Sequence, residues 1–134
     1  MSDNKPADKP VGPMLQIELA DEVYEAYTNN VFYEASSWDL KLIFGQLDQH
    51  EGGVKIIQHS AITVPWPLVK IMIYWLKGHV EAHELVNGKI HIPPTVIPIP
   101  AVLTEEVKKS DPNAEAVYAI FNRLRDEFVA SLKS

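Results

Sequence analysis

Hydrophobic and polar residues alternate along much of the first half of the chain, and a period of two residues is typical of strands with one buried face. The alternation is clearest in residues 15–19, 31–36, 40–44 and 54–64. Residues that favour turns separate these segments, at residues 28–30, 36–38 and 52–53. The pattern therefore predicts four antiparallel strands joined by short turns.

The alternation in residues 54–64 has a break in its middle. Its even positions are apolar at both ends and define one face, but Gln58 and Ser60 occupy the two central ones. A polar break of this kind predicts a β-bulge, a sheet edge or a contact with a partner.

A long helix is predicted to follow, over Pro65–Val86. Two prolines fall in its first turn, where the amide hydrogens lack helical partners in any case, and Asn87-Gly88 is a strong stop signal. Residues 68–80 are apolar on nearly every side of this helix. Because a sheet can cover only one side, the pattern predicts burial on more than one side.

Four prolines in residues 93–100 impose an extended path after the helix, and a short edge strand at Lys89–Ile92 is possible before it. We call residues 93–100 the strap. Its apolar residues between the prolines are Val96, Ile97 and Ile99. Because an extended segment has no internal hydrogen bonds, we expect these side chains to pack along a groove, in this subunit or a neighbouring one.

Apolar residues return at helical spacing in residues 112–132, after a cap and a first-position proline at Asp111-Pro112. The predicted organisation is a disordered tail (1–13), a sheet-plus-helix domain (14–100), and a linker with a C-terminal helix (101–134). The fold class is α+β, with the first helix packed on a four-stranded antiparallel sheet. The last helix is expected on the same side or on a neighbouring subunit.

Composition excludes several classes of function. The chain has 134 residues, of which 46% are hydrophobic, and a formal charge of −6, which repels nucleic acid and anionic membranes. It has no cysteine, which excludes thiol chemistry and fits a reducing compartment. The N-terminal residues contain no apolar signal segment, so we expect a cytoplasmic protein.

Candidate chemistry is sparse. His79 and His83 lie four residues apart on the predicted helix, beside Glu84, and this spacing can place two imidazoles on one metal ion. Zinc proteases have Glu directly after the first His, whereas Val80 stands there in this chain. Solvent-facing histidines are the simpler interpretation. Because the chain also lacks a nucleophile elbow and a phosphate-binding glycine loop, we expect no catalytic residue, no cofactor and no enzymatic activity.

Aromatic and apolar residues are the better candidates for a site. Trp66 stands between two prolines at the helix start, a position where an amphipathic ring often covers a partner, and Trp38 stands in a hairpin turn. With Val96, Ile97 and Ile99 they form the predicted partner-binding set. Stacking on nucleic-acid bases would require interleaved Lys and Arg residues, which these positions lack.

A set of short motifs runs through residues 17–94: Tyr27-Thr28-Asn29, Ser37-Trp38-Asp39-Leu40, Leu42, Phe44-Gly45, Pro65, Glu84 and Gly88-Lys89-Ile90. On these motifs the chain resembles family 3467 of the domain-of-unknown-function series, which are short bacterial and archaeal proteins. The resemblance implies a shared fold and carries no known activity. His83 stands where the family pattern has Tyr, which weakens a metal role as a family trait, and the residues beyond Pro100 lie outside the resemblance.

The order of the predicted elements is also similar to that of the export chaperone SecB, an acidic, cytoplasmic oligomer that holds unfolded chains in apolar grooves. This likeness is one of architecture, and a fold does not fix a function. The apolar helix and the strap carry more apolar surface than one subunit of this size should expose. We therefore expect a homo-oligomer, either a dimer or a tetramer.

The function predicted from the sequence is a non-enzymatic, chaperone-like module that binds unfolded or partner protein segments. One alternative is a small metal-binding enzyme or pH sensor that uses His79, His83 and Glu84. Another is a structural subunit of a larger assembly.

Overall fold

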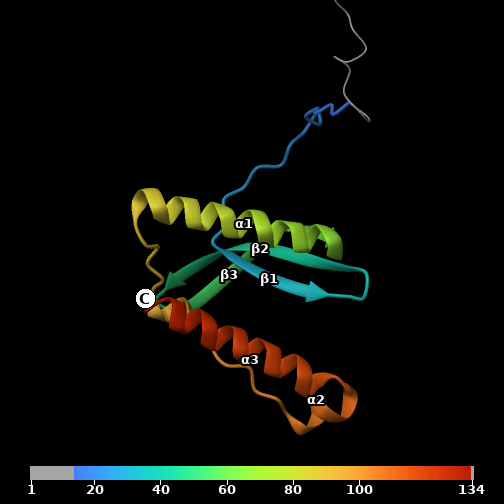
Figure 1. The fold of residues 1–134 in the computed structure, drawn as a ribbon, viewed down its shortest axis with the longest axis vertical. Coiled ribbons are helices and arrows are strands. Elements are labelled where there is room, and N and C mark those ends of the chain that lie inside the picture. Colours follow the sequence, from blue (N-terminus) through green and yellow to red (C-terminus); the bar gives the residue numbers. More distant parts are fainter. Residues whose placement is uncertain (1–13, 134) are drawn as a thin grey trace, which may run out of the picture. The chain divides into compact units, whose positions relative to one another are not determined.

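The computed structural model describes residues 14–133, so the tail predicted to be disordered lies outside the described residues. The elements are strands β1 (Asn30–Ala35), β2 (Asp39–His50) and β3 (Gly53–Pro65), helix α1 (Trp66–Asn87), the 3₁₀ turn η2 (Pro94–Val96), and helices α2 (Glu105–Ser110) and α3 (Ala114–Ser131) (Figure 1). The chain divides between Ile73 and Tyr74, within α1, into two compact units.

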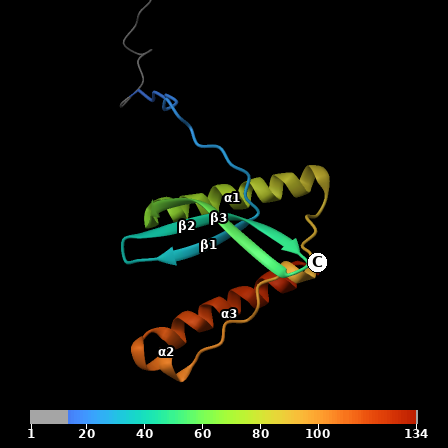
Figure 2. The same ribbon diagram turned by 180° about the vertical axis from the view of Figure 1, so that it is seen from behind.

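The first unit contains an antiparallel sheet in the order β1-β2-β3 (Figure 1, Figure 2). Because directly opposite residues of an antiparallel pair share a face, Tyr33, Leu42 and Ile62 form an apolar row across all three strands. The predicted α+β class and the antiparallel sheet are confirmed.

The sheet has three strands rather than the four predicted. Residues 15–19 form no strand, and the side chains of Leu15, Ile17 and Leu19 are 84–85% exposed. Alternation identifies a segment that could line one face of a sheet, but a strand also needs a neighbouring edge for its backbone hydrogen bonds. The edge strand considered at Lys89–Ile92 is also not formed.

A β-bulge lies at the polar break of β3. Phe44 is opposite Ser60, whereas the next residue, Gly45, is opposite Gln58, so His59 is the extra residue. The bulge predicted at this position is confirmed.

The bulge moves apolar side chains of β3 from one face of the sheet to the other. Because side chains alternate with a period of two, one extra residue reverses the faces beyond it. Val54 and Ile56 therefore lie on the opposite face from Ile62 and Val64. The sequence pattern, taken as one continuous alternation, placed all four on the same face, and the structure corrects this.

Helix α1 agrees with the predicted helix to within one residue at each end. It ends where Gly88 adopts a φ of 91°, in the left-handed region, and donates a backbone hydrogen bond to Glu84 O at 2.9 Å. None of its side chains is buried. Neither α1 nor any other helix in residues 14–133 has the length and apolar character needed to cross a bilayer.

The second unit contains the predicted C-terminal helix, which is α3 and begins two residues after Pro112. The short helix α2 before it was not predicted. Thr104 caps α2 by accepting a hydrogen bond from Val107 N at 3.2 Å. Six residues are too few for an apolar period to reveal a helix. The local signals are the cap and the charges, which are acidic in the first turn and basic in the last.

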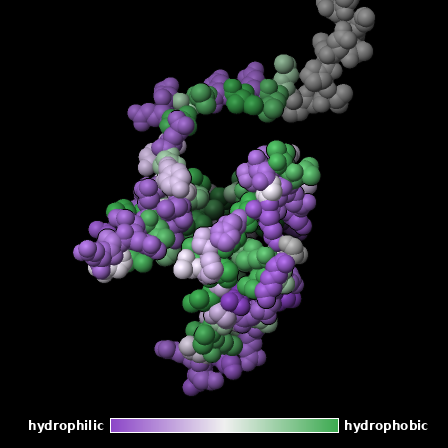
Figure 3. All heavy atoms as spheres, turned by 90° about the vertical axis from the view of Figure 1, so that its left-hand side faces the viewer, coloured by the Kyte–Doolittle hydropathy of each residue, from purple (hydrophilic) through white to green (hydrophobic). Residues whose placement is uncertain are grey.

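Very little of the described chain is enclosed. Val64 and Ala114 are the only hydrophobic residues in residues 14–133 that are buried. Figure 3 shows apolar residues, in green, at the surface of the face that it draws. Since a chain of this length normally buries roughly two-thirds of the surface of its unfolded form, much apolar surface is open to a partner.

The bulge requires a glycine opposite it, and Gly45→Ala is expected to reduce the free energy of unfolding by about 1–3 kcal/mol. A Cβ at Gly45 would lie 2.8 Å from Ile57 O, a backbone atom that cannot move aside. Urea denaturation at one fixed protein concentration measures the change. Gly52→Ala is the control, because a Cβ there meets only the His50 side chain, at 3.2 Å. Equal losses for the two variants would contradict this account.

Candidate functional site

Trp38 and Trp66, two of the predicted partner-binding residues, each donate a hydrogen bond to Ser36 in the turn between β1 and β2. The Ser36 hydroxyl oxygen accepts hydrogen bonds from the amides of Trp38 and Asp39, both at 3.1 Å. Such a serine contact replaces the backbone pairing that a turn interrupts. The indole N–H of Trp66 donates to Ser36 O at 2.9 Å and so ties the start of α1 to the turn.

The two tryptophans differ in what they offer a partner. Trp38 is 83% exposed. Trp66 is 39% exposed, and the only polar atom of its side chain, Nε1, already donates a hydrogen bond within the chain. Trp66 therefore joins two elements of the first unit, and Trp38 presents most of its ring to solvent.

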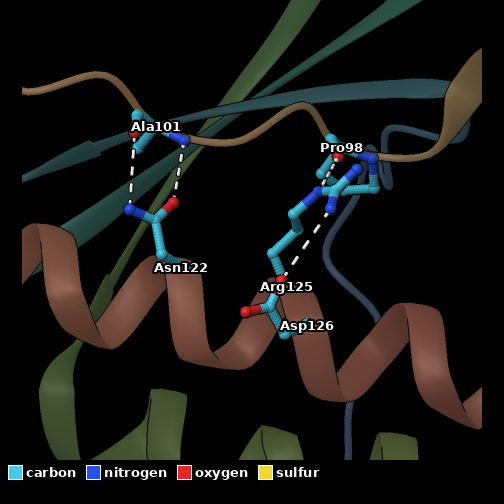
Figure 4. A network of polar contacts seen from close by, with 5 residues as sticks. All are labelled: Pro98, Ala101, Asn122, Arg125 and Asp126. Carbon is cyan, nitrogen blue, oxygen red and sulfur yellow. Dashed lines mark hydrogen bonds and ion pairs between the residues drawn. The ribbon is translucent and has the colours of Figure 1, made fainter.

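The backbone of the strap and of the next residue, Ala101, is held to α3 (Figure 4). Asn122 Oδ1 accepts a hydrogen bond from Ala101 N at 3.0 Å, and Asn122 Nδ2 donates to Ala101 O at 3.4 Å. Arg125 Nε donates to Pro98 O at 2.9 Å, and its guanidinium lies 3.9 Å from Asp126 Oδ1. These side chains supply the partners that a strand neighbour would otherwise give to the backbone of residues 98–101. The extended path predicted from the prolines is interrupted at residues 94–96, which form the 3₁₀ turn η2 with a hydrogen bond from Val96 N to Pro93 O at 3.1 Å.

Because the backbone is the anchored part, apolar side chains of the strap stay at the surface. Val96 is 56% exposed and Ile99 is 85% exposed. Ile97 is half-buried beside a hollow of about 400 Å³ that is also lined by Lys89, Ile90, His91, Ile92, Val129, Leu132 and Lys133. The groove expected for the strap is thus present for Ile97, while Val96 and Ile99 are uncovered.

The residues of the alternative metal site lie at the C-terminal end of α1. Glu84 Oε2 accepts a hydrogen bond from Ile90 N at 2.9 Å, and Asn87 Nδ2 donates to His83 O at 3.2 Å. Within residues 14–133, no three His, Asp or Glu side chains gather closely enough to hold a metal ion. Glu84 therefore has a structural contact, and the fold brings no third ligand from the described residues to His79 and His83.

Residues before β1 form a clasp on the bulge that the sequence analysis missed. The Thr28 hydroxyl donates to Gly45 O at 2.6 Å, and Asn29 Oδ1 accepts from Leu47 N at 2.7 Å. Their position beside a turn suggested only local hydrogen bonds, but they bind a strand 17 and 18 residues away in sequence. The polar break in β3 was the signal for an irregular site, although it did not identify the partners.

His59, the extra residue of the bulge, completes the clasp. Its Nε2 lies 3.2 Å from Tyr27 O, and its Nδ1 lies 2.7 Å from Ser60 Oγ. A carbonyl oxygen only accepts, so Nε2 carries the proton, and in the neutral ring Nδ1 accepts from the hydroxyl. A serine–imidazole contact also occurs in nucleophilic catalysis, but that chemistry also needs hydrogen-bond donors that stabilise the oxyanion formed in the reaction. A hollow of about 180 Å³ at this place is lined by Tyr24, Ala26, Thr28, Phe44, His59, Ser60 and Ile62.

Trp66→Phe is expected to reduce the free energy of unfolding by about 1 kcal/mol, because it removes the indole donor to Ser36 O. Trp38→Phe is the matched control. Its ring is already mostly in solvent, so a change within about 0.5 kcal/mol is expected. Urea denaturation at matched protein concentration compares the variants, and a larger loss for Trp38→Phe would show that the roles are reversed.

Asn122→Ala is expected to make the Ala101 amide exchange with solvent about fivefold faster, since one hydrogen bond is worth about 1 kcal/mol. Hydrogen exchange followed by NMR measures this amide directly. Arg123→Ala is the control on the same helix, because Arg123 pairs with Glu127 at 3.1 Å and does not hold the strap. Unchanged exchange at Ala101 in Asn122→Ala would exclude the anchoring role.

Comparison with known proteins identifies the family but no activity. The model of a family described as "Protein of unknown function (DUF3467)" matches residues 1–92, which is more than half of the chain. No curated protein and no solved structure matches. The resemblance carried by the motifs in residues 17–94 is confirmed, and the chain belongs to the DUF3467 family.

Proposed function

We propose that this protein is a homo-oligomeric, non-enzymatic module that binds extended apolar segments of other proteins, in the manner of a chaperone. The observation that carries the proposal is the geometry of the strap. Its backbone is anchored to α3 by Asn122 and Arg125, while Val96 and Ile99 face solvent. A surface that is already ordered loses less conformational entropy when it binds a partner.

The scarcity of buried side chains supports an oligomer. Tyr33 and Ile62, on the apolar row of the sheet, are 61% and 57% exposed. Monomeric proteins rarely expose large contiguous apolar surfaces, and removing such a surface from water contributes about 25 cal/mol per Å². A second copy of the chain is the partner that is always present at the same concentration, so we expect a dimer or a tetramer.

The charge of the chain favours some segments over others. A formal charge of −6 attracts segments in which basic residues flank an apolar run and repels acidic ones. We therefore propose apolar segments with flanking Lys or Arg as the preferred partners. The acidic, cysteine-free composition fits the cytoplasm, which is where we place this activity.

The order of elements adds an argument by analogy. Antiparallel strands, a helix that starts at prolines, a proline-rich strap and a C-terminal helix follow one another as they do in SecB. The likeness concerns architecture alone, since this sheet has three strands and a fold does not fix a function.

The proposal predicts that the protein suppresses the aggregation of an unfolded client, and that Val96→Asp and Ile99→Asp each reduce this activity several-fold. A charge placed on the apolar surface must lose its hydration when a client covers it. Light scattering from thermally unfolded citrate synthase measures the activity, and static light scattering of the protein alone gives its oligomeric state.

Val54→Asp is the matched control, because Val54 lies in β3 and is 63% exposed, close to the 56% of Val96. An equal loss in the control would remove the strap from the proposal. A wild-type protein that is monomeric at micromolar concentration, or that leaves client aggregation unchanged, would overturn the proposal as a whole.

A further inference from the structure

Helix α1 carries an apolar stripe with alternating spacings of three and four residues. The stripe consists of Leu68, Ile71, Trp75, Gly78, Ala82 and Leu85, and we call it the α1 stripe. In a continuous helix with 3.6 residues per turn, this spacing keeps all six residues on one side, as in the seam between two packed helices. Its four large members are 45–86% exposed.

The α1 stripe is distinct from the other sides of the helix. Helical geometry places Lys70, Lys77, Glu81 and Glu84 beyond one edge of the stripe, about 90–150° around the helix from its middle. A second apolar side includes Val69 and Met72, which are the only half-buried apolar residues of α1. The stripe is thus the more exposed of two apolar sides.

Bulky and small residues are segregated along the α1 stripe. Leu68, Ile71 and Trp75 form a ridge, and Gly78 and Ala82 follow as a low region. A Cβ at Gly78 would meet no atom within 4 Å, and a hollow of about 290 Å³ at this place is lined by Tyr74, Trp75, Gly78, His79 and Ala82. Tyr74 packs edge-to-face on Trp75 with ring centroids 5.1 Å apart, so it supports the ridge.

We propose that the α1 stripe packs against the α1 stripe of a second copy, with the two helices antiparallel. A two-fold axis between residues 76 and 77 places Trp75 opposite the second copy's Gly78, Ile71 opposite its Ala82, and Leu68 opposite its Leu85. The two central layers of the interface therefore pair a bulky residue with a small one. A parallel pair would instead place Trp75 against Trp75 and Gly78 against Gly78, which produces a clash beside a void.

The apolar surface of α1 is sufficient for such an interface. Aromatic side chains bury about 150–250 Å² each, and Tyr74 and Trp75 are 69% and 59% exposed. With the aliphatic members of the stripe they offer several hundred Å² per copy, the order of the roughly 800 Å² that each partner buries in a stable interface. The inference rests on the proposed homo-oligomer and names its interface, while the strap is left for other partners.

Cysteine cross-linking tests both the interface and its direction, since the natural chain has no cysteine. Ile71→Cys and Ala82→Cys are prepared separately, refolded together and mildly oxidised. The mixture should form a reducible covalent dimer, because the antiparallel pair places residue 71 opposite residue 82. Each variant alone should form none, because its two cysteines would be about 16 Å apart along the helices, beyond the roughly 7 Å between Cα atoms that a disulfide spans.

The outcomes separate this inference from the proposed function. Efficient cross-linking of either variant alone would indicate parallel helices and overturn the inference. No cross-link in a mixture that light scattering shows to be oligomeric would place the interface elsewhere, which overturns the inference but leaves the proposed function standing. A monomer in light scattering would overturn both.

Gly78→Leu gives an independent test. The side chain has room within the chain, and Leu is a better helix former than Gly, so circular dichroism should show an unchanged or higher helix content. The new side chain would collide with the second copy's Trp75, and the dissociation constant of the oligomer should rise at least tenfold. Lys77→Leu, about 130° around α1 from the middle of the stripe, should leave this constant unchanged. Equal dissociation constants for Gly78→Leu and wild type would overturn the inference.

Discussion

A helix in water gains most of its stability from the packing of its apolar face rather than from its own hydrogen bonds. Helix α1 depends on such packing more than most helices, since it is apolar on two sides and has no buried side chain. The sheet and the strap share this condition, because Ile62 and Ile99 are also mostly exposed. The exposure of α1 and of the sheet is explained if the stable folded object is an assembly of copies, whereas the strap stays open for other partners. This is the common basis of the proposed oligomer and of its interface.

Several of the motifs that carry the family resemblance make hydrogen bonds that connect one segment of the chain to another. Thr28 and Asn29 clasp the bulge at Gly45, and Glu84 accepts a hydrogen bond from Ile90 N just after the helix. Each contact satisfies backbone groups at a place where regular pairing stops, at a bulge or a helix end. The geometry of the chain therefore accounts for these positions.

The sequence predicted the elements whose signals are local. Alternation, turn residues and the Asn87-Gly88 stop located the three strands and α1, and the Gln58–Ser60 break located the bulge. The fourth strand failed because pairing depends on a distant edge, and α2 was too short to show a period. At the candidate site, the sequence identified Trp38 and the strap as partner-binding residues, but it predicted a strap packed along a groove, whereas Val96 and Ile99 are uncovered. The backbone anchors of the strap could not be predicted, since Asn122 lies 21 residues from Ala101 and nothing local links them.

An exposed apolar segment is normally an aggregation hazard, because it can add to the edge of a sheet through backbone hydrogen bonds. The strap lacks this route, since its four prolines have no amide hydrogen and the carbonyl of Pro98 is already bound by Arg125. What it offers is side-chain surface alone. Contacts of that kind are nondirectional and tolerate many partner sequences. On the α1 stripe, by contrast, bulky and small residues are separated along the helix, and this favours one arrangement of the two helices. The chain thus combines a surface suited to varied partners with a surface suited to its own copy.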